Sequence, residues 1–326
     1  MSSKKRRKRR KLIPIPLLVA IDIVLIACTL LIYALFQHVI PAYRADGEEG
    51  VVLSDSDDSE DLIWAEKFAE HFSDEVIITD TGYSSPHISV ELRDISDNWS
   101  TDTVAQHVLV EDIYISGISF FQTWADGGKY STAVNGIVQL SEQSGAVAAI
   151  NGDYAAFNST GYVVRNGVLY RQTQSLADVC ALYEDGRMET YSSGTFDIET
   201  AENEGVWQVW TFGPSLLNED GTAREDFTSF YSSVSAVNPR TAIGYYEPGH
   251  YCFVVADGRQ SKATGFTLPE LAKVMEGLGC KTAYNLDGGA SAQMTLNEDL
   301  VSIPTNGRRV VNDILIIREE KAGENQ

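Results

Sequence analysis

The longest run of hydrophobic positions in the chain lies close to the N-terminus, over residues 12–40. Asp22 is the only formally charged residue in it. A run of more than about 20 apolar residues can span the hydrocarbon core of a bilayer, and it is too long for the hydrophobic part of a cleaved signal peptide. The pattern therefore predicts a transmembrane signal anchor, with Asp22 either near the cytosolic interface or paired with another helix.

The residues just before this run are basic, because every position from Lys4 to Lys11 is lysine or arginine. Basic residues that flank a membrane span remain on the cytosolic side. We therefore expect a cytosolic segment over residues 1–11 and a single-pass protein of the cell membrane. Everything after about Pro41 is then expected to form an extracellular part.

Hydrophobic positions are nearly absent from residues 45–61, where Asp, Glu and Ser predominate. Segments of this composition do not bury enough apolar surface to fold. Leu62, Phe68 and Phe72 then recur at roughly helical spacing, which indicates a short helix. We predict an acidic stalk with a short helix over residues 41–83.

Beyond the stalk, apolar and polar positions alternate with a period of two, which is typical of strands. The alternation predicts strands over residues 87–95, 107–118 and 249–258. Helical spacing predicts helices over residues 133–144 and 267–279, and the second begins with a T-x-x-E capping box. The predicted fold class is α+β, in which the N-terminal transmembrane helix is followed by a strand-rich mixed α/β domain over residues 84–320 and a tail over residues 321–326.

Composition and charge narrow the class of protein further. The chain is 44% hydrophobic and 10% aromatic, and its net charge is −21 even with the basic N-terminal segment included. A strongly acidic domain disfavours nucleic acid and anionic lipid as partners. Cys180, Cys252 and Cys280 follow the apolar run without the spacing of a disulfide framework or a metal site. We interpret Cys252 and Cys280 as small core residues, with one pairing possible.

Polar residues and glycines recur where the predicted strands begin or end. These segments are Asn151–Asp153, Arg240–Thr241, Asp257–Arg259 and Asn285–Ser291. Glycines let backbone N–H groups converge on an anion, arginines bind phosphate through two hydrogen bonds, and carboxylates serve as acids or bases at glycosidic bonds. The pattern predicts one polar cleft. The alternative for each segment is an ordinary Asp-Gly turn or a surface salt bridge.

The sequence around these positions resembles a known family. The matching stretches are INGDY…GYVVRNGVLY, NPRTAIGY, VVADGRQSKATGFTLPELAKVMEGLGCKTAYNLDGGASAQM and NGRRVVNDILII. In this order they resemble the phosphodiester glycosidase family, which includes the uncovering enzyme and bacterial relatives associated with exopolysaccharide, and the likeness extends over about Val108–Ile317. It implies an α/β catalytic domain that hydrolyses a sugar 1-phosphodiester into a phosphomonoester and a free sugar.

The resemblance and the strand-end pattern together give the candidate site residues. The candidates for catalysis are Asp287, Asp257 and Asp153. The candidates for binding substrate or phosphate are Asn151, Gly152, Arg165, Arg240, Thr241, Arg259, Asn285, Gly288, Gly289 and Ser291. Asp153 and Ala290 stand where family members often have glycine, so Asp153 is either an added catalytic carboxylate or the mark of a different sugar. Arg165 precedes an Asn-Gly hairpin turn and points either into the cleft or to solvent.

No cofactor is identified, although Asp153, Asp257 and Asp287 could together offer oxygen ligands to Ca²⁺ or Mg²⁺. The predicted function is a membrane-anchored extracellular hydrolase that cleaves sugar 1-phosphodiester linkages in surface or secreted glycopolymers. One alternative is a non-catalytic module that binds phosphorylated polysaccharide and assists its assembly. Another is a metal-dependent phosphodiesterase that acts on a non-sugar substrate. The sequence does not indicate an oligomeric state.

Overall fold

The computed structural model describes residues 26, 50–53, 62–128, 130–227, 236–305 and 309–319. The chain divides into two compact units, Met1–Arg44 and Ala45–Gln326, and Ile26 is the one described residue of the first. The predicted span over residues 12–40 therefore lies outside the described residues, apart from Ile26. In the described part of the chain, no helix is both long and apolar enough to cross a membrane.

The second unit is built from three sheets, and every strand pairing described in them is antiparallel. The helices are few and short. Those in the described part of this unit are α2 (Ile137–Ser144), α3 (Ile198–Asn203) and α5 (Leu268–Gly277). The predicted α+β class, with its transmembrane helix and mixed α/β domain, is therefore wrong for the described residues. The helix signals in the sequence are local. The predicted Asn-Gly hairpin after Arg165 is present, but the strands over residues 179–211 are not among those that the sequence predicted.

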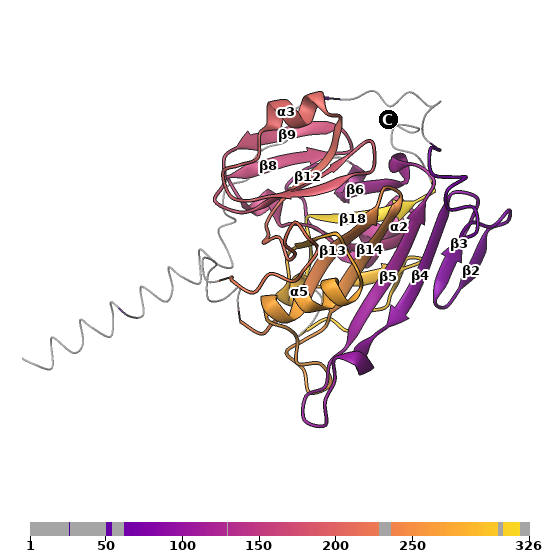
Figure 1. The fold of residues 1–326 in the computed structure, drawn as a ribbon, viewed down its shortest axis with the longest axis vertical. Helices are drawn as coiled ribbons and strands as arrows, with labels where there is room; N and C mark the ends of the chain where they lie inside the picture. Colours follow the sequence, from indigo (N-terminus) through magenta and orange to yellow (C-terminus); the bar gives the residue numbers. More distant parts are fainter. Residues whose placement is uncertain are drawn as a thin grey trace, which may run out of the picture. The chain divides into compact units, whose positions relative to one another are not determined.

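The largest sheet, sheet B, has seven strands and contributes most of the site. In spatial order they are β15 (Thr282–Asn285), β13 (Arg240–Glu247), β14 (His250–Ala256), β5 (Val108–Ile115), β4 (Ile88–Asp94), β3 (Gly82–Ser84) and β2 (Ile77–Thr79). Figure 1 shows this sheet crossing the molecule, with the β2–β3 hairpin at its outer edge.

Two further sheets complete the unit. Sheet C has five strands in the order β17 (Asp299–Leu300), β16 (Met294–Leu296), β7 (Ala146–Asn151), β18 (Asp313–Arg318) and β6 (Phe121–Ala125). Sheet A has six in the order β1 (Val51–Val52), β9 (Val168–Thr173), β8 (Gly161–Arg165), β12 (Val206–Thr211), β10 (Val179–Tyr183) and β11 (Met188–Tyr191). Short 3₁₀ turns occur at Ser96–Asn98, Ile118–Phe120, Asp126–Gly128, Ala155–Phe157 and Gly289–Ser291.

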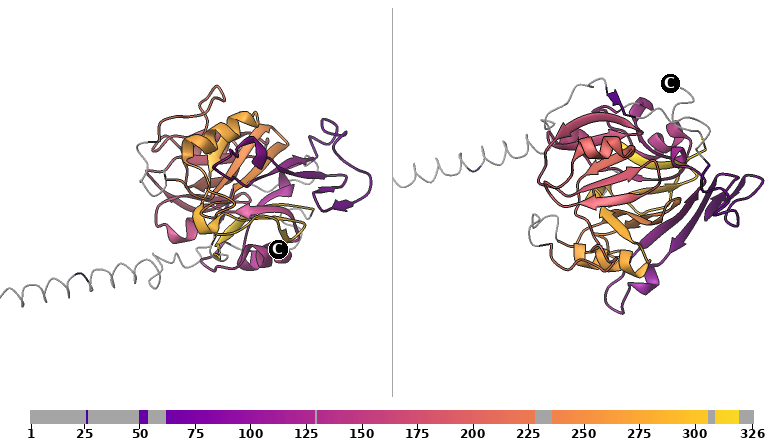
Figure 2. Two further views of the ribbon diagram at one scale, coloured as in Figure 1. Left: turned by 90° about the horizontal axis from the view of Figure 1, so that it is seen from below. Right: turned by 45° about the horizontal axis from the view of Figure 1, so that its top comes forward.

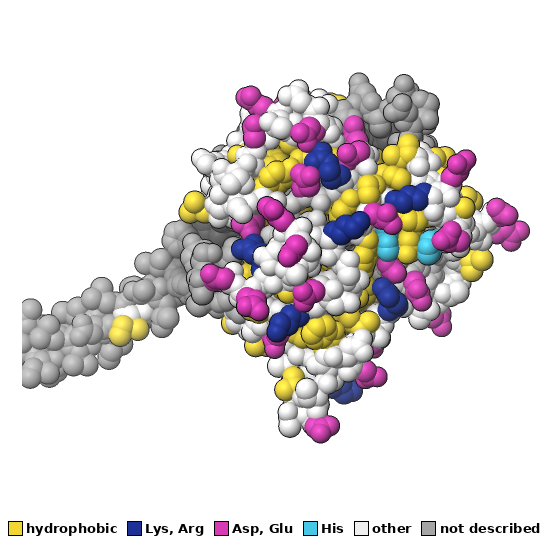
Figure 3. Space-filling model, in the orientation of Figure 1, with side chains coloured by type: hydrophobic (Ala, Val, Ile, Leu, Met, Phe, Trp, Pro, Cys, Tyr) yellow, Lys and Arg dark blue, Asp and Glu magenta, His cyan; other side chains and the backbone are white. Residues whose placement is uncertain are grey.

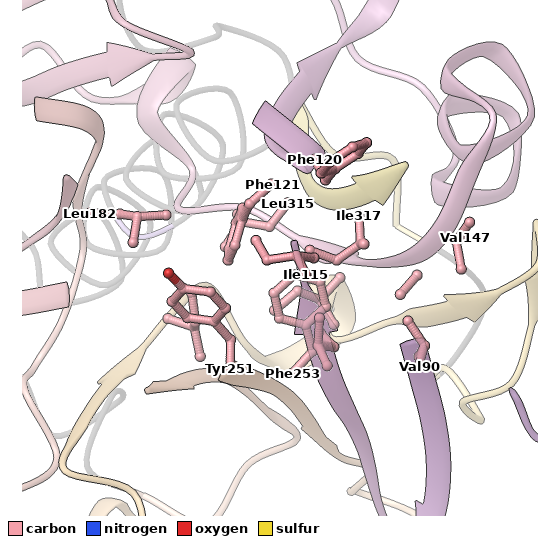
Figure 4. Packing of buried hydrophobic residues seen from close by; sticks show 14 of the residues in the cluster. Val90, Ile115, Phe120, Phe121, Val147, Leu182, Tyr251, Phe253, Leu315 and Ile317 are labelled. Carbon is pink, nitrogen blue, oxygen red and sulfur yellow. The ribbon is translucent and has the colours of Figure 1, made fainter. Parts of the chain in front are cut away.

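The central hydrophobic core lies between sheets B and C. Ile115 and Phe253 from sheet B pack in one cluster with Leu315 and Ile317 from sheet C (Figure 4). The outer face of sheet B packs against α5, and the outer face of sheet C packs against α2, so the two helices lie on opposite sides of the sandwich (Figures 1 and 2). Because both faces are covered, central strands such as β18 are buried at every position rather than at alternate ones.

Helix α5 follows the sequence prediction closely. Thr267 accepts a hydrogen bond from the Glu270 amide, and the Glu270 carboxylate accepts one from the Thr267 amide at 2.7 Å. This capping box satisfies amide groups that the first turn of a helix leaves unpaired. The chain then leaves the helix through Gly279, which has a φ of +82°, a conformation that glycine adopts at little cost.

Two other local predictions have mixed outcomes. Residues 62–71 form successive turns instead of a regular helix, and Trp64 and Phe68 are buried in the central core. Cys252 and Cys280 are buried free cysteines, as expected of small core residues, and their sulfur atoms lie 3.7 Å apart.

Glu111 is a carboxylic acid buried in the middle of β5, where its neighbours across the sheet are Leu92 and Phe253. Neither carboxyl oxygen has a hydrogen-bond partner among the described residues. Because burial in apolar surroundings disfavours the charged form, it raises the pKa of Glu111 well above its ordinary value. The folded protein therefore holds this proton more tightly than the unfolded chain does.

This difference predicts how stability depends on pH. Above the ordinary carboxyl pKa the unfolded chain releases the Glu111 proton and the folded protein keeps it, so stability is lost as pH rises, by up to about 1.4 kcal/mol per pH unit. The Glu111→Gln variant cannot lose this proton, and its free energy of unfolding should fall less between pH 5 and pH 7. Urea unfolding of both proteins at the two pH values measures the difference. Parallel pH dependences would contradict the prediction.

Candidate active site

The start of one strand and the ends of two others lie together at one end of sheet B. The candidate active site is the open pocket that they border. Arg240 opens β13, which pairs antiparallel with β14 through Ala256 and with β15 through Asn285. Antiparallel pairing places the start of β13 beside the ends of both neighbours. The residues around these ends therefore line a common pocket of about 240 Å³, which we call the arginine pocket; they include Phe212, Asn238, Arg240, Arg259, Asp287 and Arg309.

Three arginines line this pocket, although acidic side chains are spread over the molecular surface in Figure 3. Arg240 is buried and donates to the carbonyls of Phe266 at 2.9 Å and Ala236 at 2.6 Å. Burial and the nearby Arg259 charge lower the pKa of Arg240 to about 10. Two neighbouring cations repel each other, and a bound anion relieves that repulsion. The pocket is therefore suited to bind an anionic group.

Arg259 and Arg309 extend this positive surface. Arg259 is exposed and donates to the Asn238 side chain. The Arg309 guanidinium lies 5.0 Å from the centre of the Tyr154 ring and donates to the Tyr154 hydroxyl at 3.2 Å. Neither arginine forms a salt bridge with another described residue, so the alternative of a structural ion pair does not account for them.

Asp287 is the carboxylate of the arginine pocket. It follows β15 and is half-buried. Burial raises its pKa, while the Ser291 hydroxyl, the Arg309 charge and the Gly288 amide act in the opposite direction. The Asn151 amide group donates to the Asp287 carbonyl at 2.6 Å, which fixes the backbone beside sheet C. The backbone of Asp287 is thus fixed in place, and its carboxyl group is partly exposed in a pocket that three arginines line.

The two glycines after Asp287 are required by close backbone packing. A Cβ atom on Gly288 would lie 2.6 Å from the Pro239 carbonyl oxygen. Gly289 has a φ of +61° and donates its amide to the same carbonyl at 2.9 Å. This amide is therefore already used inside the protein. Ala290 lies in the following 3₁₀ turn without a positive φ, so the absent third glycine leaves the turn unchanged.

Asn151, Thr241 and Asn285 hold the walls of the pocket together. The Asn151 amide oxygen accepts from the Thr241 hydroxyl at 2.8 Å and from the Gln293 amide at 3.2 Å, which links sheets B and C. The Asn285 amide group donates to the Gly213 carbonyl at 2.7 Å. The Asn285 amide oxygen is buried without a partner among the described residues, and Asn285 borders the arginine pocket.

Asp153 and Arg165 belong to a separate buried charge network. Arg165 donates to Asp153 at 2.7 Å and to Asp313 at 3.0 Å, and all three side chains are buried. Asp153 also accepts from the amides of Ala155 at 3.2 Å and Thr211 at 2.8 Å. Both Asp153 oxygens are therefore occupied within the protein, and Arg165 does not line the arginine pocket.

Asp257 also has partners away from the arginine pocket. It is buried, and one oxygen lies 2.5 Å from the His107 ring nitrogen Nδ1 and accepts from the Ile303 amide at 2.8 Å. The hydrogen bond to Asp257 raises the pKa of His107. Asp257 does not border the arginine pocket. In this structure it connects the start of β5 to the loop around Ile303.

Comparison with known proteins identifies the family. Residues 144–318, more than half of the chain, match the family model described as phosphodiester glycosidase. The chain belongs to the phosphodiester glycosidase family. It is 26% identical over 190 residues to the SPbeta prophage-derived uncharacterized protein YomE of Bacillus subtilis. It is 27% identical over 202 residues to N-acetylglucosamine-1-phosphodiester alpha-N-acetylglucosaminidase of Bos taurus.

These matches cover part of each protein. They include 56% and 58% of this chain but only 29% and 38% of the two relatives, so the chain spans less than two fifths of either. The catalytic domain of the zebrafish N-acetylglucosamine-1-phosphodiester alpha-N-acetylglucosaminidase, in a structure auto-inhibited by its pro-peptide, has the same fold. It aligns with a TM-score of 0.57 at 19% identity over 88% of this chain and 99% of that one.

Two residues in or near the arginine pocket are not among the candidates that the sequence gave. Arg309 lines the arginine pocket and Asp313 pairs with Arg165. Both stand in NGRRVVNDILII, a stretch that carries the family resemblance. The signal in the sequence is an acid at the start of a strand with a basic pair a few residues before it, which resembles the other polar strand ends. Ile314 pairs with Asn151, so the start of β18 reaches the site from sheet C.

The carboxylates that the sequence offered as metal ligands do not gather in this family member. Asp153 pairs with Arg165, Asp257 with His107, and Asp287 lines the arginine pocket. Among the described residues, no group of three or more His, Cys, Asp or Glu side chains is arranged to hold a metal ion.

Proposed function

We propose that this protein hydrolyses sugar 1-phosphodiesters and releases a free sugar and a phosphomonoester. The observation that carries the proposal is the half-buried Asp287 carboxyl beside Arg240, Arg259 and Arg309 in one pocket. The curated relative from Bos taurus bears a name with the same linkage, N-acetylglucosamine-1-phosphodiester. Family membership over residues 144–318 supports hydrolysis of phosphodiester-linked sugars in general.

The chemistry of the linkage fits the charges of the pocket. A phosphodiester is a monoanion, and it gains negative charge as its bond to the sugar breaks. Arginines held in place before the reaction stabilise that charge. At the anomeric carbon the transition state is positively charged, and Asp287 is the carboxylate that would stabilise it. Because the leaving phosphate is a weak base held by cations, this reaction does not require a strong general acid.

The proposal also covers the natural substrate of the protein and its location in the cell. We infer that the sugar belongs to a surface or secreted glycopolymer and that the domain acts outside the cell. The support is the sequence alone, in which the basic stretch Lys4–Lys11 precedes the apolar residues 12–40. Protease treatment of intact cells tests the location, since an outward-facing domain is digested without lysis.

The direct test is release of sugar by the purified full-length chain. N-Acetylglucosamine 1-(methyl phosphate) and glucose 1-(methyl phosphate) are the substrates, with and without EDTA, and free reducing sugar is measured. Release in both arms supports a metal-independent glycosidase. Binding without release would favour the non-catalytic module. Cleavage of bis(4-nitrophenyl) phosphate that EDTA abolishes, with no sugar released, would favour the metal-dependent phosphodiesterase.

Arg259→Ala should weaken substrate binding. Loss of a charge-assisted hydrogen bond is worth about 1.5–3 kcal/mol, so KM should rise by about 10- to 100-fold. Steady-state kinetics measure the change. Arg259→Lys keeps the charge but cannot form a bidentate hydrogen bond, and its KM should lie between those of the wild type and Arg259→Ala. Arg187→Ala is the matched control, because Arg187 pairs with Glu189 and Glu204 elsewhere on the surface. An unchanged KM for Arg259→Ala would rule out a phosphate contact.

A further inference from the structure

A second, much smaller pocket opens beside the arginine pocket, and Asp287 lines both. We call it the narrow pocket; its lining includes Asn151, Gly152, Asp287, Ser291, Asn312 and Asp313. It leaves about 10 Å³ for the centre of a water-sized sphere, which is room for one water molecule. A sugar ring does not fit there. The pocket therefore suits a small molecule that reaches the reaction centre from the side of sheet C.

Several groups around the narrow pocket are hydrogen-bond acceptors, although the hydroxyl groups of Tyr154 and Ser291 also line it. Asp287 and Asp313 contribute carboxyl groups. Asn312 is buried, its amide nitrogen donates to the Ala133 carbonyl at 2.9 Å, and its amide oxygen has no partner among the described residues. Two carboxyl groups and an amide oxygen without a partner among the described residues favour a molecule that can donate hydrogen bonds. Water meets this requirement, whereas a phosphate oxygen does not.

Arg165 and Gly152 together position the Asp313 carboxyl group. One oxygen accepts from the Arg165 guanidinium at 3.0 Å. The other lies against Gly152, where a Cβ atom would be only 2.1 Å away. Glycine at position 152 is thus a condition for this carboxyl to reach the narrow pocket. Asp153 shares Arg165 but does not line the pocket.

We propose that Asp313 is a catalytic residue, the general base that deprotonates a water molecule in the narrow pocket as this water attacks the anomeric carbon. The inference rests on the proposed function and specifies which bond of the phosphodiester is cleaved. The water oxygen bonds to the anomeric carbon, and the bond from that carbon to the phosphate oxygen breaks. The bonding electrons go to the phosphate oxygen in the arginine pocket, and the proton goes to Asp313. The products are the free sugar and the phosphomonoester.

The ionisation of Asp313 is consistent with this role. Burial raises its pKa to about 6, with Arg165 acting in the opposite direction and Asp153 in the same one. A base of this strength is unprotonated at neutral pH and still accepts a proton efficiently. The kcat/KM of the wild-type protein should therefore fall as pH decreases below about 6. The Asp313→Asn variant should lack this dependence.

The experiment compares the full-length wild type with Asp313→Asn and Asp153→Asn. All three act on N-acetylglucosamine 1-(methyl phosphate) in ¹⁸O-labelled water, and the phosphomonoester is analysed by mass spectrometry. We expect no label in the phosphate, because the water oxygen enters the sugar. Removing a general base should lower kcat by about 10²- to 10⁴-fold in Asp313→Asn, whereas Asp153→Asn should stay within tenfold of the wild type.

Both variants remove a partner of Arg165, so thermal unfolding is recorded for each and activity is compared below both transitions. Sodium formate supplies a small external base, and it should restore activity to Asp313→Ala but leave the activity of Asp153→Ala unchanged. Label in the phosphate, or equal losses in the two Asn variants with no rescue and an unchanged pH profile, would overturn the role of Asp313. Absence of sugar release by the wild type would instead overturn the proposed function.

Discussion

Asp287→Asn is expected to lower kcat for sugar release by about 10³-fold or more, which lies within the range for the loss of a catalytic carboxylate. The amide has nearly the same shape as the carboxyl group but cannot stabilise positive charge at the anomeric carbon. Binding of inorganic phosphate should persist, because the three arginines of the pocket remain. Release of reducing sugar measures the first effect, and calorimetric titration with phosphate measures the second.

Asp257→Asn is the matched control for this variant. Asp257 also precedes a glycine at a strand end, but it pairs with His107 and lies away from the arginine pocket. The control should lose stability while it keeps most of its kcat. If Asp287→Asn retained wild-type kcat, or if both variants lost kcat equally, Asp287 would not be a catalytic carboxylate.

The second large effect is expected when Arg165 is replaced, and it is a loss in the free energy of unfolding. Arg165→Met should reduce the free energy of unfolding by about 3–5 kcal/mol at pH 7, because it leaves Asp153 and Asp313 buried without their cation. Without Arg165 the two carboxyl groups favour the neutral form, so acid should recover part of the loss. The deficit relative to wild type should therefore be smaller at pH 5 than at pH 7. Urea unfolding at both pH values measures it.

Arg187→Met provides the comparison for Arg165. Arg187 also has acidic partners, but its ion pairs with Glu189 and Glu204 lie at the surface. Surface pairs of this kind contribute about 0–1 kcal/mol. A loss in Arg165→Met no greater than that in Arg187→Met would show that the buried network does not stabilise the fold.

Local features of the fold could be predicted from the sequence because their causes lie within a few residues. The capping box at Thr267 and Glu270 specifies where α5 begins, and the alternation over residues 107–118 and 249–258 identifies β5 and β14. The strands of sheet A over residues 161–211 gave weaker signals. β10 and β12 are buried at every position and show no alternation. β14 is also buried at every position but the first, and the sequence indicates it through the aromatic and β-branched residues between Gly249 and Gly258.

The site shows the same division between local and distant causes. The segments that contain Asp153, Asp257 and Asp287 look alike in sequence, since in each an Asp and a Gly are adjacent at the end of a strand. Composition and motif order were enough to select these segments and to identify the family. They could not assign different roles to the three carboxylates.

The sequence by itself determined the helix caps, the positions where glycine is needed and the set of polar strand ends. Only the tertiary structure decided which carboxylate faces the arginines. Asp257 meets His107 across 150 positions of the chain, and Arg165 meets Asp313 across 148. Such pairs depend on the register of antiparallel strands and on how two sheets pack. Burial, partners and pKa follow from that packing, and these properties distinguish carboxyl groups that look alike in the sequence.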